Sequence, residues 1–222
     1  IDTPAVDWNN GYDFAKLAEA SDGLMIMAYD YHWSSASQAG PVAPYDDSSK
    51  WGGYNVVSTL ETYLTATGDN REKLILGVPY YGYDWPTSSA SVPTNTTGTG
   101  TAKAYNDIQA DLASGKSRKW DEDSRSPYYN YGSYRQVWYE DASSLNYKYD
   151  LVNSSGIAGI GIWALGYDGA RTELWDRIEE KFGKLSSFSL LTPPDGSVIS
   201  EARPTFRWNE VTGSGVSYKL RY

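Results

Sequence analysis

The chain has 222 residues, enough for one or two domains, with 19 Lys and Arg against 28 Asp and Glu and a formal net charge of −9. This balance argues against nucleic acid and anionic membrane surfaces as partners, because both are bound through basic patches. The absence of cysteine excludes disulfides, thiolate zinc sites and thiol nucleophiles. No apolar run approaches the length of a transmembrane helix, so no membrane partner is predicted.

Three apolar runs organise the first part of the chain, at residues 24–28, 74–78 and 159–163. They do not alternate apolar with polar residues, which is typical of strands buried on both faces in a parallel sheet. Segments of helical spacing separate them, around residues 14–18, at 56–64 and at 174–182. This β/α alternation predicts an α/β fold with a parallel sheet or barrel, whose chemistry lies at the ends of the strands.

Residues 84–155 interrupt this rhythm. A loop rich in Ser, Thr and Gly at 86–100 precedes a helix with Ala104, Ile108 and Leu112 on one face. Short runs at 119–121, 128–131 and 134–139 favour antiparallel strands, and a helix from about 142 to 153 returns to the third apolar run. We interpret the segment as an α+β insertion carried by the main sheet.

The C-terminal part has a different character. Residues 184–189 are predicted to be a linker, and 190–222 alternate like short strands. That pattern resembles the start of a fibronectin type III or immunoglobulin-like module. A complete sandwich needs about seven strands and about 100 residues, so we expect a truncated β-sandwich here.

Aromatic usage points to a ligand class. The chain has 20 Tyr and 9 Trp but only 4 Phe. Tyr and Trp combine a flat apolar face with a hydrogen-bonding edge. Sugars present C–H faces that stack on rings and hydroxyls that need polar partners, so the composition is compatible with a carbohydrate ligand. The alternative is that these rings are half-buried surface residues.

Four motifs then carry a specific resemblance. The sequence Met-Ala-Tyr-Asp-Tyr-His at 27–32, Pro-Tyr-Tyr-Gly at 79–82, Trp-Tyr-Glu-Asp at 138–141 and Gly-Ile-Trp-Ala-Leu-Gly at 161–166 occur in the order found in glycoside hydrolase family 18. That family contains chitinases and sporulation-type N-acetylglucosaminidases. The resemblance covers about residues 1–183 and implies the last strands, from the end of strand five to strand eight, of a (β/α)8 barrel.

The family's general acid is a Glu in an Asp-x-x-Asp-x-Asp-x-Glu motif, and this chain contains no such motif. We therefore expect the chain to begin near strand five, at residues 1–4, and the N-terminal part of the barrel to be a partner supplied from outside it. By itself the chain is expected to be inactive, whereas the parent protein is expected to be a glycosidase. Three unclosed strands predict that the edge at 24–28 is covered by another chain, by residues 188–222 or by other parts of the same protein.

The resemblance implies substrate-assisted retaining hydrolysis of β-1,4-linked N-acetylglucosamine polymers, either chitin or peptidoglycan, in a secreted or cell-surface protein. It implies no cofactor and no metal. Tyr29 and Asp30 are the catalytic candidates, for orienting and polarising the acetamido group. The substrate-binding candidates are Met27, Tyr31, Tyr81, Trp138 and Trp163.

Alternatives remain at several of these positions. Tyr29 and Asp30 could cap a strand end, Trp163 could be a core residue, and Tyr81 could serve a turn. The single histidine, His32, fits a structural hydrogen-bonding role better than a catalytic one. The acidic run at 121–123 fits a solvated face, and Trp33, Trp85, Trp120 and Trp138 fit either outer sugar subsites or loop packing. A non-catalytic, lectin-like relative and a remnant without sugar contact are the alternative functions.

Overall fold

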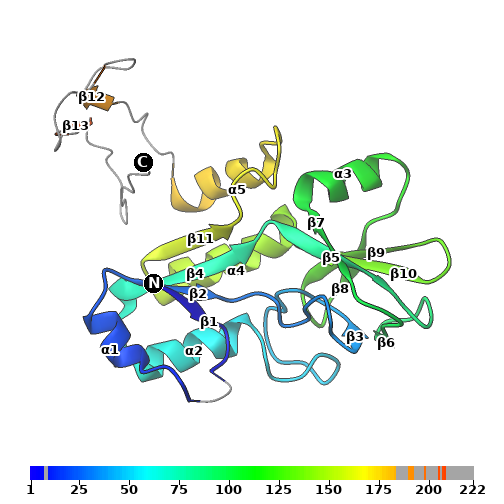
Figure 1. The fold of residues 1–222 in the computed structure, drawn as a ribbon, viewed down its shortest axis with the longest axis horizontal. Coiled ribbons are helices and arrows are strands. Elements are labelled where there is room, and N and C mark those ends of the chain that lie inside the picture. Colours follow the sequence, from blue (N-terminus) through cyan, green and yellow to red (C-terminus); the bar gives the residue numbers. More distant parts are fainter. Residues whose placement is uncertain (8–9, 184–189, 193–197, 199–204, 206, 209–222) are drawn as a thin grey trace.

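The computed structural model describes residues 1–7, 10–183, 190–192, 198, 205, 207 and 208 (Figure 1). Its main sheet has four parallel strands in the order β1-β2-β4-β11. Their bounds are β1 (Asp2–Pro4), β2 (Leu24–Met27), β4 (Leu74–Pro79) and β11 (Gly159–Trp163). The parallel arrangement predicted for the three apolar runs, in that order, is confirmed.

The edge of β2 is covered differently from the prediction. Strand β1 pairs with it in parallel, with Asp2 opposite Met25 and Pro4 opposite Met27. The prediction that another chain or residues 188–222 would cover this edge is therefore wrong. The first residues of the chain, which were expected to be the end of strand five, are extended and satisfy the backbone groups of β2 themselves; their pairing with this edge was not predicted.

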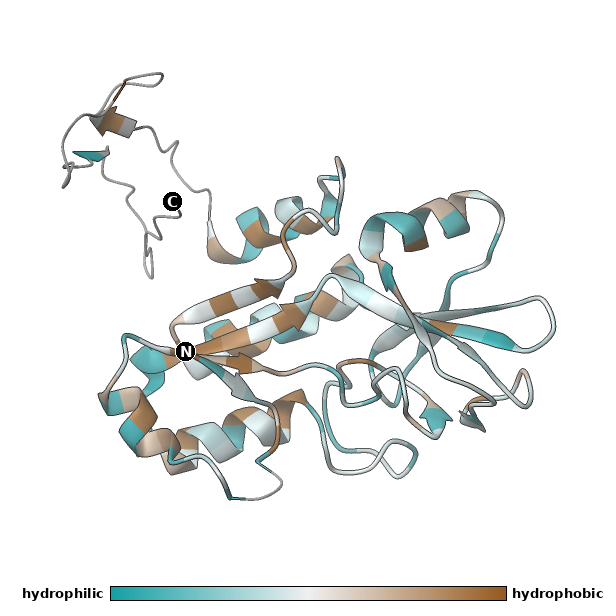
Figure 2. Cartoon of the chain, viewed as in Figure 1, coloured by the Kyte–Doolittle hydropathy of each residue, from teal (hydrophilic) through white to brown (hydrophobic). Residues whose placement is uncertain are grey.

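Four helices pack on this sheet (Figure 1), with α1 beside α2 and α4 beside α5. They are α1 (Phe14–Glu19), α2 (Val56–Ala66), α4 (Ala142–Ser155) and α5 (Glu173–Phe182). Asn55 and Asp141 begin α2 and α4, each with a side chain that accepts hydrogen bonds from the first turn. Apolar residues gather along β2, β4 and β11 (Figure 2); core side chains of β2 and β4 are buried, whereas Ile160 and Ile162 of β11 are partly buried against them.

The insertion forms its own antiparallel sheet in the order β7-β5-β10-β9-β8, with helix α3 (Tyr105–Ala113) against it. The strands are β5 (Tyr81–Pro86), β7 (Thr101–Ala104), β8 (Lys119–Asp121), β9 (Ser126–Tyr131) and β10 (Arg135–Tyr139). The three strands predicted within the insertion are present. Its sheet begins at residue 81 rather than 84, however, and α4 belongs to the core of the main sheet through Leu145, Tyr149 and Val152.

The segment that connects the two sheets is very short. Only Tyr80 separates the end of β4 from the start of β5, so the insertion follows directly from the carboxyl end of a main-sheet strand (Figure 1). Strands β5 and β10 also approach closely, because a Cβ on Gly82 would lie 2.1 Å from the carbonyl oxygen of Trp138. Glycine is therefore required at that position.

Short elements complete the described chain: β3 (Gln38–Ala39) pairs with β6 (Thr94–Asn95), and η1 (Arg71–Lys73) precedes β4. Strand β12 (Leu190–Thr192) pairs antiparallel with β13 (Arg207–Trp208). The predicted linker at 184–189 and most of the predicted sandwich module lie outside the described residues. Among the helices that the structure describes, none combines the length and the apolar character that crossing a bilayer would require.

Candidate active site

A cleft of about 270 Å³ lies where the main sheet meets the insertion. It is lined by Met27, Tyr29, Asp30, Tyr81, Tyr83, Ala102, Trp163 and Tyr167. The residues come from the carboxyl ends of β2 and β11, from β5 and β7 of the insertion, and from the segment after β11. Five predicted site residues therefore meet in one place: Met27, Tyr29, Asp30, Tyr81 and Trp163.

Asp30 lies in the cleft between two phenols. The hydroxyl of Tyr81 donates to Oδ1 at 2.5 Å, and the hydroxyl of Tyr83 donates to Oδ2 at 3.3 Å. Burial raises the pKa of Asp30, and these two hydrogen bonds act in the opposite direction because they stabilise the carboxylate. The backbone of Asp30 has a φ of +61°, a left-handed conformation that Asp adopts more readily than most residues and that is common at functional sites.

Tyr29 presents a hydroxyl that hydrogen-bonds to no residue in the described part of the chain. Burial, aided by the negative charges of Asp2 and Asp30, raises the pKa of Tyr29 to about 12. At neutral pH the phenol is therefore protonated and available as a hydrogen-bond donor. Its ring meets the ring of Tyr81 edge-on, with centroids 6.1 Å apart.

Gly77 allows Tyr29 to lie close to β4. A Cβ on this glycine would be 2.4 Å from the carbonyl oxygen of Ile26 and 3.1 Å from Cε1 of Tyr29. The first distance is shorter than real Cβ contacts allow, so strand β2 and the ring of Tyr29 would have to move. Glycine at this position therefore positions a site residue as well as two strands.

Trp163 ends β11 with 50% of its surface exposed. Its carbonyl oxygen accepts a hydrogen bond from the backbone N–H of Tyr80 at 2.7 Å. The backbone is thus held by the neighbouring strand while the indole remains open to the cleft. The alternative that Trp163 is a core residue does not agree with this exposure.

Sequence reasoning missed Tyr83, Tyr167 and Ala102. Tyr83 stands two residues after Tyr81 on the same strand, so the period of a β-strand places both side chains on one face and could have found it. Tyr167 follows β11, and its ring is perpendicular to that of Tyr81 at a centroid distance of 6.4 Å. Nothing local in the sequence distinguishes Tyr167 or Ala102 from other loop and strand residues.

Two predicted substrate-binding residues are outside the cleft. Trp138 has no exposed surface, its indole donates to Oε1 of Gln136 at 3.1 Å, and its ring stacks on Tyr128. A fully buried ring cannot contact a sugar, so its assignment to substrate binding is wrong. Tyr31 turns its hydroxyl inward, donating to the carbonyl oxygen of Asn55 at 3.0 Å with Thr59 Oγ1 2.6 Å away. This hydroxyl anchors helix α2, and Tyr31 also lines a second hollow next to the cleft.

The histidine has the structural role that the sequence favours. Nδ1 of His32 lies 2.9 Å from the carbonyl oxygen of Pro41, and its ring packs edge-on against Trp51. Burial lowers the pKa of His32, so the imidazole is neutral at pH 7.

The remaining tryptophans divide between surface and interior. Trp33 is 60% exposed and lines a second hollow of about 420 Å³, which shares Met27, Tyr29 and Asp30 with the cleft. Trp85, by contrast, has no exposed surface and belongs to loop packing. Trp33 is thus the predicted outer-subsite candidate that stands beside the cleft.

The acidic residues give the site a limited chemistry. Asp30 is the only carboxylate among the residues that line the cleft and the second hollow. Within the described residues, no group of three or more His, Cys, Asp and Glu side chains could hold a metal ion.

Asp121 is not part of a solvated face as predicted: it is 4% exposed and bonds Lys50, Trp51 and Ser124.

Comparison with known proteins assigns the fold and the family. The family described as "Glycosyl hydrolases family 18" matches residues 1–168. A "Probable endochitinase" of Caenorhabditis elegans is 33% identical over 174 residues, which cover 71% of this chain and 28% of that protein. The human "Di-N-acetylchitobiase" is 30% identical over 200 residues, covering 77% of this chain and 49% of the relative. The chain thus spans half or less of the length of these relatives.

A "Putative sporulation-specific glycosylase YdhD" of Bacillus subtilis is 31% identical over 169 residues, covering 72% of this chain and 36% of that protein. Among solved structures, a Group IV chitinase of Ostrinia furnacalis is 27% identical with a TM-score of 0.69, covering 81% of this chain and 56% of that chain. The fold is the mixed α/β type of these chitinases, and the family predicted from the four motifs is confirmed. The chain belongs to glycoside hydrolase family 18.

Proposed function

We propose that this chain supplies the substrate-orienting side of a glycosidase that hydrolyses β-1,4-linked N-acetylglucosamine polymers. The observation that carries the proposal is the convergence of Tyr29, Asp30, Tyr81 and Trp163 in one cleft. The set combines a protonated phenol, a carboxylate and an exposed indole. These are the groups needed to donate to an acetamide, to balance positive charge that develops on it, and to stack under a sugar ring.

The proposed reaction is substrate-assisted and retaining. An electron pair on the acetamido oxygen forms a bond to the anomeric carbon, while the electrons of the glycosidic bond pass to the leaving oxygen. A general acid gives that oxygen its proton. Water then adds to the anomeric carbon, returns a proton to the same acid and frees the acetamide. In this scheme Tyr29 donates to the acetamido group and Asp30 stabilises its positive charge.

The general acid is proposed to lie outside these 222 residues, on the remaining strands of a (β/α)8 barrel of which this chain is the part from strand five to strand eight. Asp30 is the only carboxylate that lines the cleft, and it is bonded by two phenols. Most glycosidases of this type need a carboxylic acid beside the scissile bond. The parallel sheet β1-β2-β4-β11 with its carboxyl ends at the cleft is compatible with such a barrel segment.

The same observation favours one alternative, a non-catalytic protein that holds the sugar. A cleft with a stacking indole and a single carboxylate can bind a saccharide without cleaving it. The presence of chitinases, chitobiases and a sporulation glycosylase among the relatives supports chitin or peptidoglycan as the polymer in either case. We propose that the protein acts outside the cell or at its surface, where these polymers occur.

The test compares binding with turnover. The 222-residue chain and the protein extended by its natural upstream sequence are assayed for binding of chitotetraose by calorimetry and for release of a fluorescent aglycone from a chitobiose substrate. The proposal expects turnover by the extended protein, none by the chain alone, and loss of turnover in Asp30→Asn. Binding without turnover by both forms would favour the non-catalytic alternative, and absence of both would reject a saccharide site.

A further inference from the structure

Tyr167 lines the cleft from a segment that belongs to no helix or strand. This cleft segment, residues 164–172, connects β11 to α5, and 36% of the surface of Tyr167 is exposed. Two turns fold it locally: the backbone N–H groups of Tyr167 and Gly169 each donate to the carbonyl oxygen three residues earlier, at 3.1 Å. These turns set the course of the segment but not its place beside the cleft, which needs a contact from another element.

Helix α3 provides this contact with its first turn. The first N–H groups of a helix have no partner within it, and no side-chain cap satisfies those of α3 in the described chain. The N–H of Asn106 donates instead to the carbonyl oxygen of Tyr167 at 2.9 Å. The N–H of Tyr105 donates to the carbonyl oxygen of Tyr80, the residue between β4 and β5, also at 2.9 Å. The start of α3 thus binds both the junction of the two sheets and the cleft segment.

The side chain of Asn106 contacts the cleft segment as well. Its Oδ1 accepts a hydrogen bond from Nε of Arg171 at 3.3 Å. Gly169 lies against it, because a Cβ on this glycine would be 2.9 Å from Cγ of Asn106, closer than real Cβ atoms come. The φ of Gly169 is +63°, which favours glycine independently of that contact. Asn106 therefore holds the segment through its backbone and its side chain, at positions 167, 169 and 171.

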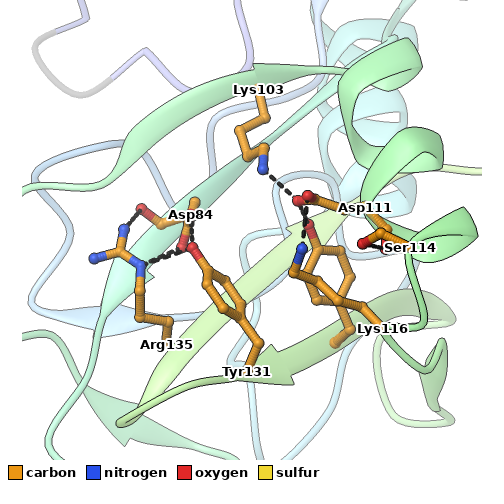
Figure 3. A network of polar contacts seen from close by, with 8 residues as sticks. Asp84, Lys103, Asp111, Ser114, Lys116, Tyr131 and Arg135 are labelled. Carbon is orange, nitrogen blue, oxygen red and sulfur yellow. Dashed lines mark hydrogen bonds and ion pairs between the residues drawn. The ribbon is translucent and has the colours of Figure 1, made fainter.

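Asp111 ties the far end of α3 to the insertion sheet (Figure 3). Its carboxylate pairs with Lys103 of β7 and with Lys116, whose Nζ lies 2.7 Å from Oδ1, and it accepts from the hydroxyl of Tyr129 on β9 at 2.5 Å. Burial alone would raise the pKa of Asp111, but these bonds outweigh it and hold the pKa well below its ordinary value, so the group is ionised at neutral pH. The helix is thus fixed to the insertion sheet at one end and to the cleft segment at the other.

The position of Tyr167 matters for the cleft because its ring faces a phenol that bonds Asp30. The rings of Tyr167 and Tyr81 are perpendicular, with centroids 6.4 Å apart. Tyr81 stands on β5 of the insertion, whereas the cleft segment continues from Trp163 of the main sheet. A displacement of the segment therefore changes the width of the cleft beside Asp30. The hydroxyl of Tyr167 bonds no residue of the described chain, which leaves it available to a ligand.

We propose that Asn106 is a positioning residue of the cleft, through which helix α3 holds Tyr167 at the place where its hydroxyl bonds a hydroxyl of the substrate sugar. Asn106 does not itself line the cleft. The inference rests on the proposed function, since it takes the ligand to be a saccharide, and it gives the insertion a second part in substrate binding besides the phenols of β5. Displacing the cleft segment from Asn106 should therefore weaken saccharide binding although no residue that lines the cleft is replaced.

The first measurement needs no sugar. The tyrosine rings of the 222-residue chain are labelled with carbon-13, and the Tyr167 signal is identified by its absence in Tyr167→Phe. Gly169→Ala should shift this signal, because the new methyl group meets Asn106 and moves the segment. Gly166→Ala is the matched control: its φ is also positive, at +85°, but nothing lies within 4 Å of a Cβ there. An unshifted Tyr167 signal in Gly169→Ala, or equal shifts in both variants, would overturn the proposal.

Calorimetry with chitotetraose gives the effect on binding. We expect the affinity of Gly169→Ala to fall about three- to tenfold, as when a hydrogen bond to the ligand is lost, and that of Gly166→Ala to change less than about twofold. Asn106→Leu, which removes the acceptor for Arg171, should also bind more weakly. Asn106→Asp retains an acceptor and should bind nearly as the unsubstituted chain does. Thermal unfolding of each variant shows that the comparison is made between folded proteins.

Two outcomes contradict the proposal in different ways. Normal chitotetraose affinity in both Gly169→Ala and Asn106→Leu would overturn the role of Asn106 and leave the proposed function intact. Absence of binding by the unsubstituted chain would reject the saccharide cleft itself, and with it the role of Asn106 in binding, even where the Tyr167 signal has shifted.

Discussion

Nζ of Lys148 lies 2.7 Å from Oε2 of Glu140, and neither side chain has more than 1% of its surface exposed. Burial raises the pKa of Glu140, and the charge and hydrogen bond of Lys148 oppose that shift. Oε1 of the same carboxylate has no partner in the described chain, so the ammonium group is the principal compensation for this buried charge. The pair fixes the end of β10 to helix α4.

Replacing Lys148 with methionine should therefore destabilise the protein strongly. The variant leaves Glu140 buried without its counter-ion, an effect that typically costs about 3–5 kcal/mol. Chemical denaturation of Lys148→Met against the unsubstituted chain measures it. Glu140→Leu combined with Lys148→Met is the control, and it should recover most of the loss because two apolar groups need no pairing. Equal stability of the single and double variants would contradict this account.

The pKa of Asp30 should depend on the hydrogen bonds that it accepts from Tyr81 and Tyr83. We expect the Asp30 carboxyl to titrate above its ordinary value of 3.8, because burial outweighs the two hydrogen bonds. Tyr81→Phe should raise the pKa further, by more than Tyr83→Phe does, because the Tyr81 contact is 2.5 Å long and the Tyr83 contact 3.3 Å. Carbon-13 NMR of the Asp30 carboxyl during acid titration gives these values directly. A decrease on either substitution would contradict the assignment.

The same shift has a consequence for folding. A carboxyl whose pKa is higher in the folded state binds its proton more tightly there, so its stabilising contribution is present at low pH and is lost as pH rises through the folded pKa. Asp30→Asn cannot titrate. We therefore expect the stability of Asp30→Asn relative to the unsubstituted chain to increase between pH 3.5 and pH 7. Thermal unfolding at several pH values measures the difference, and a flat or falling profile would count against the raised pKa.

Trp163→Ala should weaken saccharide binding while leaving the fold intact. Half of the indole surface is exposed, so its removal takes little from the core, whereas the stacking surface in the cleft is lost. Aromatic contacts of this kind are worth about 0.5–1.5 kcal/mol, which corresponds to a loss of affinity of roughly two- to tenfold. Calorimetry with chitotetraose is the measurement. Trp175→Ala, at a tryptophan that is 42% exposed and outside the cleft, is the matched control and should bind normally.

Gly77→Ala should displace Tyr29 and thereby disturb the cleft. Its methyl group would meet the carbonyl oxygen of Ile26 at 2.4 Å, so β2 and β4 must separate and Tyr29 must move. We expect a loss of stability of about 1–3 kcal/mol, as for other overpacked sites, together with weaker saccharide binding. The control is Gly53→Ala, where the nearest atom to a Cβ is 3.7 Å away. A chain that tolerates Gly77→Ala with unchanged binding would show that Tyr29 is not held by this contact.

The main sheet was predictable because its strands are long, apolar and uninterrupted. Their parallel pairing follows from such runs. Burial on both faces, which the runs also predicted, holds largely for β4, whereas β2 alternates buried and half-buried residues and β11 has no buried residue. Strand β1 was expected at residues 1–4 only through the family resemblance, because its three residues carry no such pattern and it forms by pairing with β2. Its existence depends on tertiary contact rather than on local sequence.

The site was predictable only where motif and position coincide. Tyr29, Asp30 and Trp163 follow apolar strands directly, and parallel strands bring their carboxyl ends to one edge. Trp138 was assigned incorrectly because an aromatic residue in a polar run resembles a surface platform. Strand β10 is buried on both faces: Gln136 and Trp138 on one face and Val137 and Tyr139 on the other have no exposed surface. Whether a face of an insertion sheet is covered depends on the elements packed on it, and the sequence of the strand does not contain that information.

Because only Tyr80 separates β4 from β5, the residues of the cleft come from two different sheets. Asp30 and Trp163 are held by the main sheet, whereas the phenols that bond Asp30 stand on the first strand of the insertion. Any tilt of the insertion sheet therefore changes the lengths of the two phenol contacts and, through them, the acidity of the carboxylate. The pKa of Asp30, a residue at the end of a main-sheet strand, thus depends on the orientation of the insertion sheet.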